Sequence, residues 1–130
     1  SGVSAVQQNP YLSLYGQGVL VAVLDTGIDY QHPAFKNIDG TTRILSIWDQ
    51  TVQSGTVPEE FTFGSEYSRE QINEALQAEN PLAVVPVTDT LGHGTAMASI
   101  LAGTPSEDGS FRGVVPHLFC RRKCNLLSGI

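Results

Sequence analysis

Two residues able to do acid–base chemistry stand in distinctive settings in this sequence. Asp25 ends a short apolar run, Val19 to Leu24, and His93 lies between two glycines at the start of an alanine-rich stretch. A carboxylate that hydrogen-bonds one imidazole nitrogen fixes the tautomer and stabilises the charge that forms when the other nitrogen takes a proton. We therefore interpret Asp25 and His93 as a candidate pair in which the carboxylate orients a general base.

The apolar run before Asp25 predicts a buried strand. Val19 to Leu24 is rich in β-branched residues and has Gly18 and Gly27 on its two sides. This pattern is typical of a strand covered on both faces near the centre of a parallel sheet. Sites in open α/β sheets form at the carboxyl ends of such strands, where Asp25 would stand. The alternative is that Asp25 only caps a helix or shapes the turn.

The stretch that begins at His93 predicts a helix ending at Gly103. The partial positive charge of a helix N-terminus disfavours imidazolium, so the ring would stay neutral and able to accept a proton. A lone histidine before a helix more often has a structural role, but the flanking glycines and Asp25 favour chemistry here. The predicted apolar stripe of this helix consists of Ala96, Met97, Ile100 and Leu101.

Three further elements are expected between the two candidate residues. The segment from Arg43 to Asp49 favours a strand, because its isoleucines and tryptophan suit a half-buried pleated surface. Ser68 followed by Gln71 predicts a capping box at the start of a second helix. The segment from Leu82 to Val87 favours a short strand, which Pro86 would make an edge or irregular one.

Composition limits the classes of function. The chain has 130 residues, 41% of them hydrophobic, and a formal net charge of −6, which suits one globular domain. All thirteen acidic residues precede Arg112, so the acidic body argues against nucleic-acid binding. No apolar run approaches the ~20 residues of a membrane span, and no signal-like segment opens the chain. Cys120 and Cys124 form neither a disulfide framework nor a convincing zinc motif.

Two motifs taken together resemble those of a known family. Val21-Ala-Val-Leu-Asp-Thr-Gly-Ile-Asp29, followed by His32-Pro33, and Gly92-His-Gly-Thr95 leading to Ala102-Gly103, are similar to the aspartate and histidine signatures of subtilisin-like serine proteases. The resemblance covers about residues 16–116. The segment Ile47-Trp-Asp-Gln-Thr51 resembles bacterial subtilases linked to spore germination, which would imply a secreted or spore-associated protein.

The resemblance implies an α/β fold with an incomplete, doubly wound and mostly parallel sheet, truncated after the histidine helix. Residues 1–116 would be the N-terminal portion of a catalytic domain, and residues 117–130 an atypical basic, cysteine-containing tail. The family position that often carries an acidic calcium ligand is Ala34 here, so no cofactor is expected. The substrate of the full-length parent would be a peptide or protein. The missing C-terminal half or another chain would complete the sheet.

The family's nucleophilic serine lies in a later Gly-Thr-Ser-Met-Ala-type motif that this sequence lacks. Ser99 would point to another face of the histidine helix, Ser128 lacks the glycine context of a nucleophile, and Thr95 suits a local helix-start hydrogen bond. The chain would thus carry the Asp and His of a Ser-His-Asp triad and be inactive alone.

Two other functions stay open at this point. A non-catalytic pseudoprotease could use the same fold as a sensor or binding module. A dimeric aspartic protease of the retroviral type could use Asp25 in its Asp-Thr-Gly sequence. The aspartic protease fold is nearly all β, so the two predicted helices argue against it.

Overall fold

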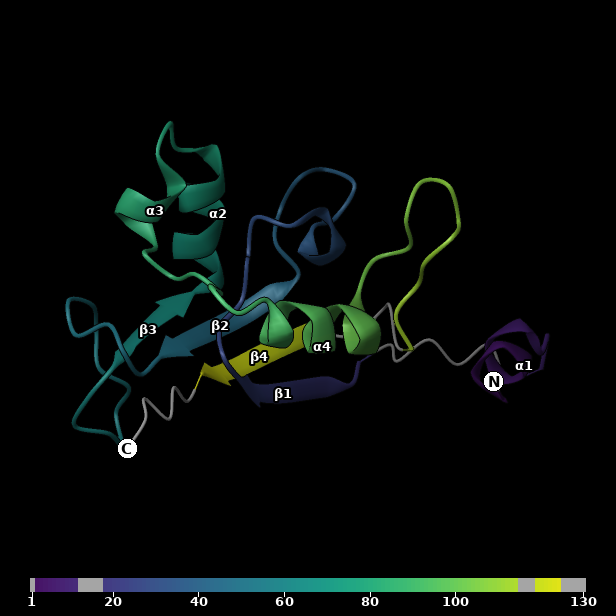
Figure 1. The fold of residues 1–130 in the computed structure, drawn as a ribbon, viewed down its shortest axis with the longest axis horizontal. Coiled ribbons are helices and arrows are strands. Elements are labelled where there is room, and N and C mark those ends of the chain that lie inside the picture. The colour runs from purple at the N-terminus through teal and green to yellow at the C-terminus, as the bar shows by residue number, and fades with distance from the viewer. Residues whose placement is uncertain (1, 12–17, 115–118, 125–130) are drawn as a thin grey trace.

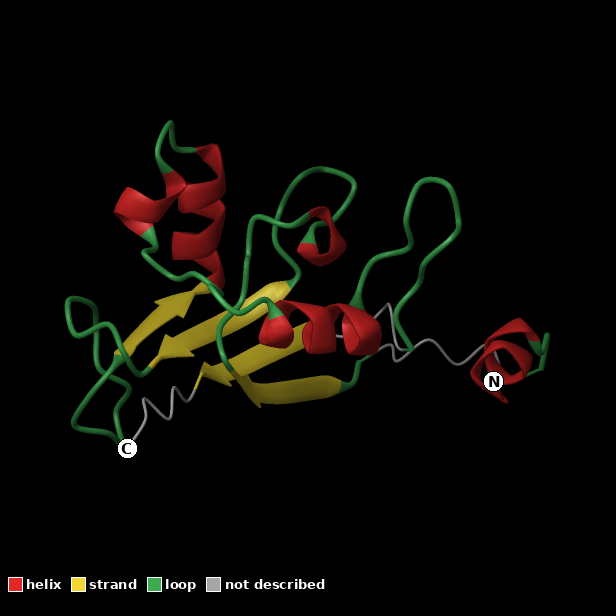
Figure 2. Cartoon of the chain, viewed as in Figure 1, coloured by secondary structure: helices red, strands yellow, loops and turns green. Residues whose placement is uncertain are grey.

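The computed structural model describes residues 2–11, 18–114 and 119–124. Most of the helices lie beside or in front of different parts of a small sheet, and the N-terminal helix lies apart from it (Figures 1 and 2). The elements in chain order are α1 (Gly2–Gln8), β1 (Leu20–Asp25), the 3₁₀ turn η1 (Pro33–Phe35), β2 (Ile44–Asp49), β3 (Ser65–Ser68), α2 (Arg69–Gln77), α3 (Pro81–Val84), α4 (His93–Ala102) and β4 (Phe119–Cys124).

The sheet has the strand order β1-β4-β2-β3. Strand β4 runs parallel to both β1 and β2, whereas β3 runs antiparallel to β2. The mostly parallel α/β architecture is therefore confirmed. The expectation that the strand ending at Asp25 lies near the sheet centre is wrong for the described residues. Strand β4 takes the place between β1 and β2, which leaves β1 at the edge (Figure 1).

The predicted burial of the first strand on both faces is also wrong. Exposure alternates along β1, and Leu20, Ala22 and Leu24 are the exposed residues. The relative exposure of Leu20 is 53% and that of Leu24 is 57%. A continuous apolar run does not separate a doubly covered strand from an edge strand with one open face, because both place apolar side chains at every position.

Helix α4 packs against β1 and η1, and Figure 1 shows it lying across the sheet. It starts at His93 and ends before Gly103, as predicted. The predicted apolar stripe is wrong. The buried residues are Gly94, Ala98 and Ala102, spaced four apart on one face, whereas Met97 and Ile100 are exposed. Small residues on the inner face let the helix backbone approach its neighbours closely.

The second helix begins as the sequence predicts. The Ser68 hydroxyl accepts the Gln71 amide, and the Gln71 side chain accepts the Ser68 amide in return, which completes the capping box. The strand expected from Leu82 to Val87 is wrong. Residues Pro81–Val84 form the short helix α3 instead, because proline at the first helical position loses no needed amide and presets the backbone angle.

The hydrophobic core lies between the sheet, α2, α4 and the turn that follows β1. Its largest fully buried side chain is Tyr30, whose hydroxyl donates to the Val85 carbonyl over 3.0 Å. Burial, with a smaller effect of the Asp29 charge, raises the pKa of Tyr30 to about 12. The other core residues include Ile28, Phe35, Ile44, Ile47, Tyr67, Ile72 and Val87. None of the helices in the described ranges combines the length and apolarity needed to cross a bilayer.

Candidate active site

The structure brings Asp25 and His93 into direct contact across 68 residues of sequence. Asp25 is the last residue of β1 and His93 is the first residue of α4. The distance between Asp25 Oδ1 and His93 Nδ1 is 2.7 Å. The Asp25 side chain is 13% exposed and the His93 side chain is 63% exposed. The carboxylate is thus sheltered, and the imidazole reaches the surface.

The geometry assigns the imidazole tautomer. An ionised carboxylate only accepts hydrogen bonds, so Nδ1 of His93 must carry the proton that bonds to Asp25. In the neutral ring Nε2 is then the free acceptor. The Thr26 amide also donates to Asp25 Oδ1 over 2.7 Å, which fixes the carboxylate next to the backbone of the turn after β1. The pair can therefore take up a proton at Nε2 while Asp25 stabilises the resulting imidazolium.

The other hydroxyl groups considered as nucleophiles are engaged elsewhere or lie outside the described residues. The Ser99 hydroxyl donates to the Ala96 carbonyl over 2.8 Å. The Thr95 hydroxyl donates to Asp89 over 2.7 Å. Ser128 falls in the part of the chain that the structure does not describe. Among the residues whose side chains the structure describes, no hydroxyl hydrogen-bonds the His93 ring, which bonds to Asp25.

Ala34, the position where the family often carries an acidic ligand, is buried in η1. Its carbonyl oxygen accepts the Thr104 amide over 2.8 Å and the Thr104 hydroxyl over 3.1 Å. The described residues contain no group of three or more histidine, cysteine or carboxylate side chains placed to hold a metal.

Sequence reasoning assigned no role to Thr26 or Asp89, yet both lie at the contact between β1 and α4. The Thr26 hydroxyl donates to Asp89 Oδ1 over 2.9 Å, and Asp89 Oδ2 accepts the Thr95 amide over 2.8 Å. An acidic residue shortly before a predicted helix start is a helix-capping signal. That signal could have identified Asp89, although not its bond to Thr26.

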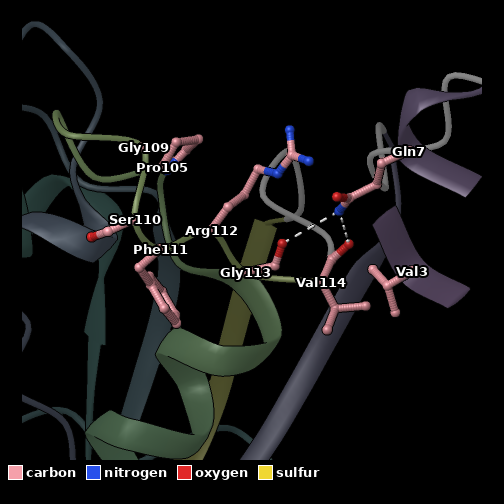
Figure 3. Close-up of a pocket in the computed structure, with 9 residues that line it drawn as sticks. All are labelled: Val3, Gln7, Pro105, Gly109, Ser110, Phe111, Arg112, Gly113 and Val114. Atoms are coloured by element: carbon pink, nitrogen blue, oxygen red, sulfur yellow. Dashed lines mark hydrogen bonds between the residues drawn. The ribbon is translucent and has the colours of Figure 1, made fainter. Parts of the chain in front are cut away.

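Two surface hollows lie away from the pair. One has a volume of about 480 Å³ and lies between α1 and the loop after α4 (Figure 3). There the buried Gln7 side chain donates to the Val114 carbonyl over 2.7 Å and so ties α1 to that loop. The other, of about 1000 Å³, is lined by His32, Ser99 and Phe111 among others. Neither hollow includes Asp25 or His93.

A family model described as the subtilase family, Peptidase S8, matches residues 16–118. This chain belongs to the subtilase family. The matched residues contain both Asp25 and His93, and they account for most of the chain. The subtilase assignment excludes the dimeric aspartic protease, and so do the parallel strands and helices α2 and α4, because that fold is nearly all β.

Known subtilases resemble the chain over most of its length. It is 29% identical over 123 residues to the subtilisin-like protease SBT1.9 of Arabidopsis thaliana, and 33% identical over 109 residues to the subtilisin-like protease SBT3 of Solanum lycopersicum. These alignments cover 82% and 78% of this chain but only 16% and 14% of the two relatives.

A solved protease structure also matches. The CspB protease of Clostridium perfringens superposes with a TM-score of 0.75 at 38% sequence identity. The match covers 93% of this chain and 23% of the clostridial chain. The described fold is thus that of one part of a subtilisin-like protease.

Proposed function

We propose that Asp25 and His93 are the orienting carboxylate and the general base of a serine endopeptidase. The observation that carries this proposal is the 2.7 Å contact between Asp25 Oδ1 and His93 Nδ1, which leaves Nε2 as a free acceptor on an exposed ring. Membership of the subtilase family supports it, because serine proteases use this pair of residue types in this arrangement.

In the proposed reaction a serine hydroxyl attacks the peptide carbonyl carbon, and His93 Nε2 takes the hydroxyl proton. Collapse of the tetrahedral intermediate breaks the C–N bond, and His93 gives that proton to the leaving amine. Water then attacks the acyl-enzyme in the same way and releases the acid. Asp25 holds the ring in one tautomer throughout and stabilises the imidazolium.

The serine would come from polypeptide outside residues 1–130, as would most of the substrate-binding surface. Two features support this: the described residues place no hydroxyl against His93, and the chain spans less than a quarter of each relative. We expect the isolated chain to hydrolyse no peptide and to resist labelling by a serine-directed phosphonate. Labelling of the isolated chain at a serine would contradict this part of the proposal.

A chimera tests the roles of the two residues. The segment of the clostridial CspB protease that superposes on this chain would be replaced by this chain, and peptide hydrolysis would be measured. Removing a triad member costs several orders of magnitude in kcat. We therefore expect an active chimera to lose at least ~10³-fold in kcat on His93→Ala and on Asp25→Ala.

His32→Ala is the matched control, because His32 is the other histidine among the described residues and lines a hollow away from the pair. It should leave kcat within a few-fold of the parent chimera. An active chimera that tolerates His93→Ala as well as it tolerates His32→Ala would contradict the proposal.

A further inference from the structure

The carboxylate of Asp89 lies four residues before His93 and accepts hydrogen bonds from both sides of the Asp25–His93 pair. On the strand side, the Thr26 hydroxyl donates to Asp89 Oδ1 over 2.9 Å. On the helix side, Oδ1 accepts the Gly92 amide over 3.0 Å. Oδ2 accepts the Thr95 amide over 2.8 Å and the Thr95 hydroxyl over 2.7 Å.

The two threonine hydroxyls extend this network in opposite directions. Each hydroxyl donates its single proton in a hydrogen bond to Asp89, so each oxygen is left to accept a hydrogen bond from another donor. Thr26 Oγ1 accepts the Gly94 amide over 3.1 Å, which links the end of β1 to the first turn of α4. Thr95 Oγ1 accepts the Asp29 amide over 2.9 Å, which links α4 back to the turn after β1.

These bonds also satisfy the start of α4. The first amides of a helix lack partners within the helix, and Gly92 provides no side-chain cap. The Gly94 and Thr95 amides are instead capped by Thr26 and Asp89. Partial burial raises the pKa of Asp89, but the bonds from Thr95, Thr26 and Gly92 together outweigh this and hold the pKa below its usual value.

The exposure of His93 makes such a support necessary. With 63% of its side chain exposed, the imidazole has little packing to fix its position. The distance to Asp25 therefore depends on where the backbones of residues 25–26 and 92–94 are held. Those are the segments that Asp89 joins.

We propose that Asp89 is a positioning residue that holds Asp25 and His93 at hydrogen-bonding distance, acting through the Thr26 hydroxyl and the first turn of α4. This inference rests on the proposed function of Asp25 and His93. Asp89 acts through its bonds to Thr26, Gly92 and Thr95, so its effect is on the alignment of the pair.

Nuclear magnetic resonance of the 130-residue chain tests this without any need for activity. The readout is the proton on His93 Nδ1 and its rate of exchange with water, with Asp25→Asn as the reference that removes the carboxylate partner. In Asp89→Asn an amide NH₂ replaces one of the two acceptor oxygens, so the side chain can no longer accept both the Gly92 amide and the Thr95 amide in the wild-type arrangement. We expect the His93 Nδ1 proton to exchange at least about tenfold faster, or to vanish.

A matched pair at Thr26 gives the same test with a smaller change. Thr26→Val keeps the shape but removes the hydroxyl, and should reproduce the effect of Asp89→Asn. Thr26→Ser keeps the hydroxyl and should restore exchange close to that of the wild type. Asp108→Asn is the control, because Asp108 is a loop carboxylate that accepts hydrogen bonds from its chain neighbours Ser106 and Ser110.

The outcomes separate the two proposals. If the wild-type signal is absent or unaffected by Asp25→Asn, the proposed pair is wrong and this inference falls with it. If the signal depends on Asp25 but survives unchanged in folded Asp89→Asn, only the role of Asp89 is wrong. If Asp89→Asn fails to fold, the Thr26 pair decides, and equal exchange in Thr26→Val and Thr26→Ser overturns the inference.

Discussion

Gly27 is the residue at which the turn after β1 comes closest to the segment that carries Asp89. A Cβ at Gly27 would overlap the Thr88 carbonyl oxygen and lie 2.9 Å from the Asp89 Cα. The Thr88 carbonyl oxygen and the Asp89 Cα are both backbone atoms, and the Asp89 side chain is held by its hydrogen bonds, so moving either atom would cost free energy. A side chain here would push apart the two segments that meet at the candidate site.

We predict that Gly27→Ala destabilises the chain more than an ordinary glycine replacement in a turn. Gly40→Ala is the matched control, because Gly40 has φ +83° and a Cβ added there would meet nothing within 4 Å. Backbone strain alone should cost Gly40→Ala about 1–2 kcal/mol. Gly27→Ala should cost roughly 1–3 kcal/mol more because of overpacking. Urea denaturation measures both, and equal costs would contradict the prediction.

At this scale the sequence predicts which residues meet but not what holds them. Asp25 and His93 could be identified because each stands at a recognisable end of an element, and their contact is present. The role of Asp89 could not be predicted. It depends on the direction of the Thr26 and Thr95 hydroxyls, which only the folded arrangement of two distant segments determines.

Helix α4 contacts the rest of the protein through small side chains. Ala98 is 1% exposed and faces the core, whereas Ala96 on the same helix is exposed. We predict that Ala98→Leu costs about 1–3 kcal/mol because added methylene groups have no space in a close-packed core. Ala96→Leu makes the same chemical change at the surface and should stay within about 0.5 kcal/mol of the wild type. Urea denaturation compares them, and a cost for Ala96→Leu equal to that for Ala98→Leu would show that α4 does not pack through this face.

Element boundaries followed from local signals, whereas the faces and neighbours of the elements did not. The Ser68–Gln71 capping box and the helix end at Gly103 can each be predicted from a few neighbouring residues, and both predictions are confirmed. The predicted buried face of α4 was wrong because the prediction ranked residues by hydrophobicity and so chose Met97 and Ile100. The helix instead buries glycine and alanine, whose small side chains let its backbone lie close to the neighbouring elements. The predicted central position of β1 was wrong because strand order depends on pairing with residues 119–124.

For the molecule as a whole, the main consequence of the strand order is an open apolar edge. Leu20 and Leu24 are more than half exposed on β1, and no described strand pairs with its outer side. Open edges and exposed apolar faces promote association with other chains. In a longer polypeptide the same surface would be available to further parts of the domain.

We therefore predict that the isolated 130-residue chain self-associates as its concentration rises. Leu20→Lys should lower the associated fraction, because a charge on an edge strand opposes pairing. Ile38→Lys is the control, since Ile38 is fully exposed in a loop outside the sheet. Sedimentation velocity over a concentration series measures the associated fraction. A wild-type chain that stays monomeric throughout, or an equal effect of both lysines, would contradict the prediction.

The place of β4 between β1 and β2 also constrains the order of events during synthesis. Leu20 pairs with Phe119 and Ile44 with Cys120, so neither parallel ladder can form until β4 has left the ribosome. Until then the nascent chain can form the β2–β3 pair and the helices, but the two parallel ladders, which join distant segments, must wait. Until residues 119–124 emerge, Asp25 would therefore stand at the end of a strand without a ladder partner, held by the contacts of β1 with α4 and by the bond of Thr26 to Asp89, and the sheet that carries the candidate site would be completed late.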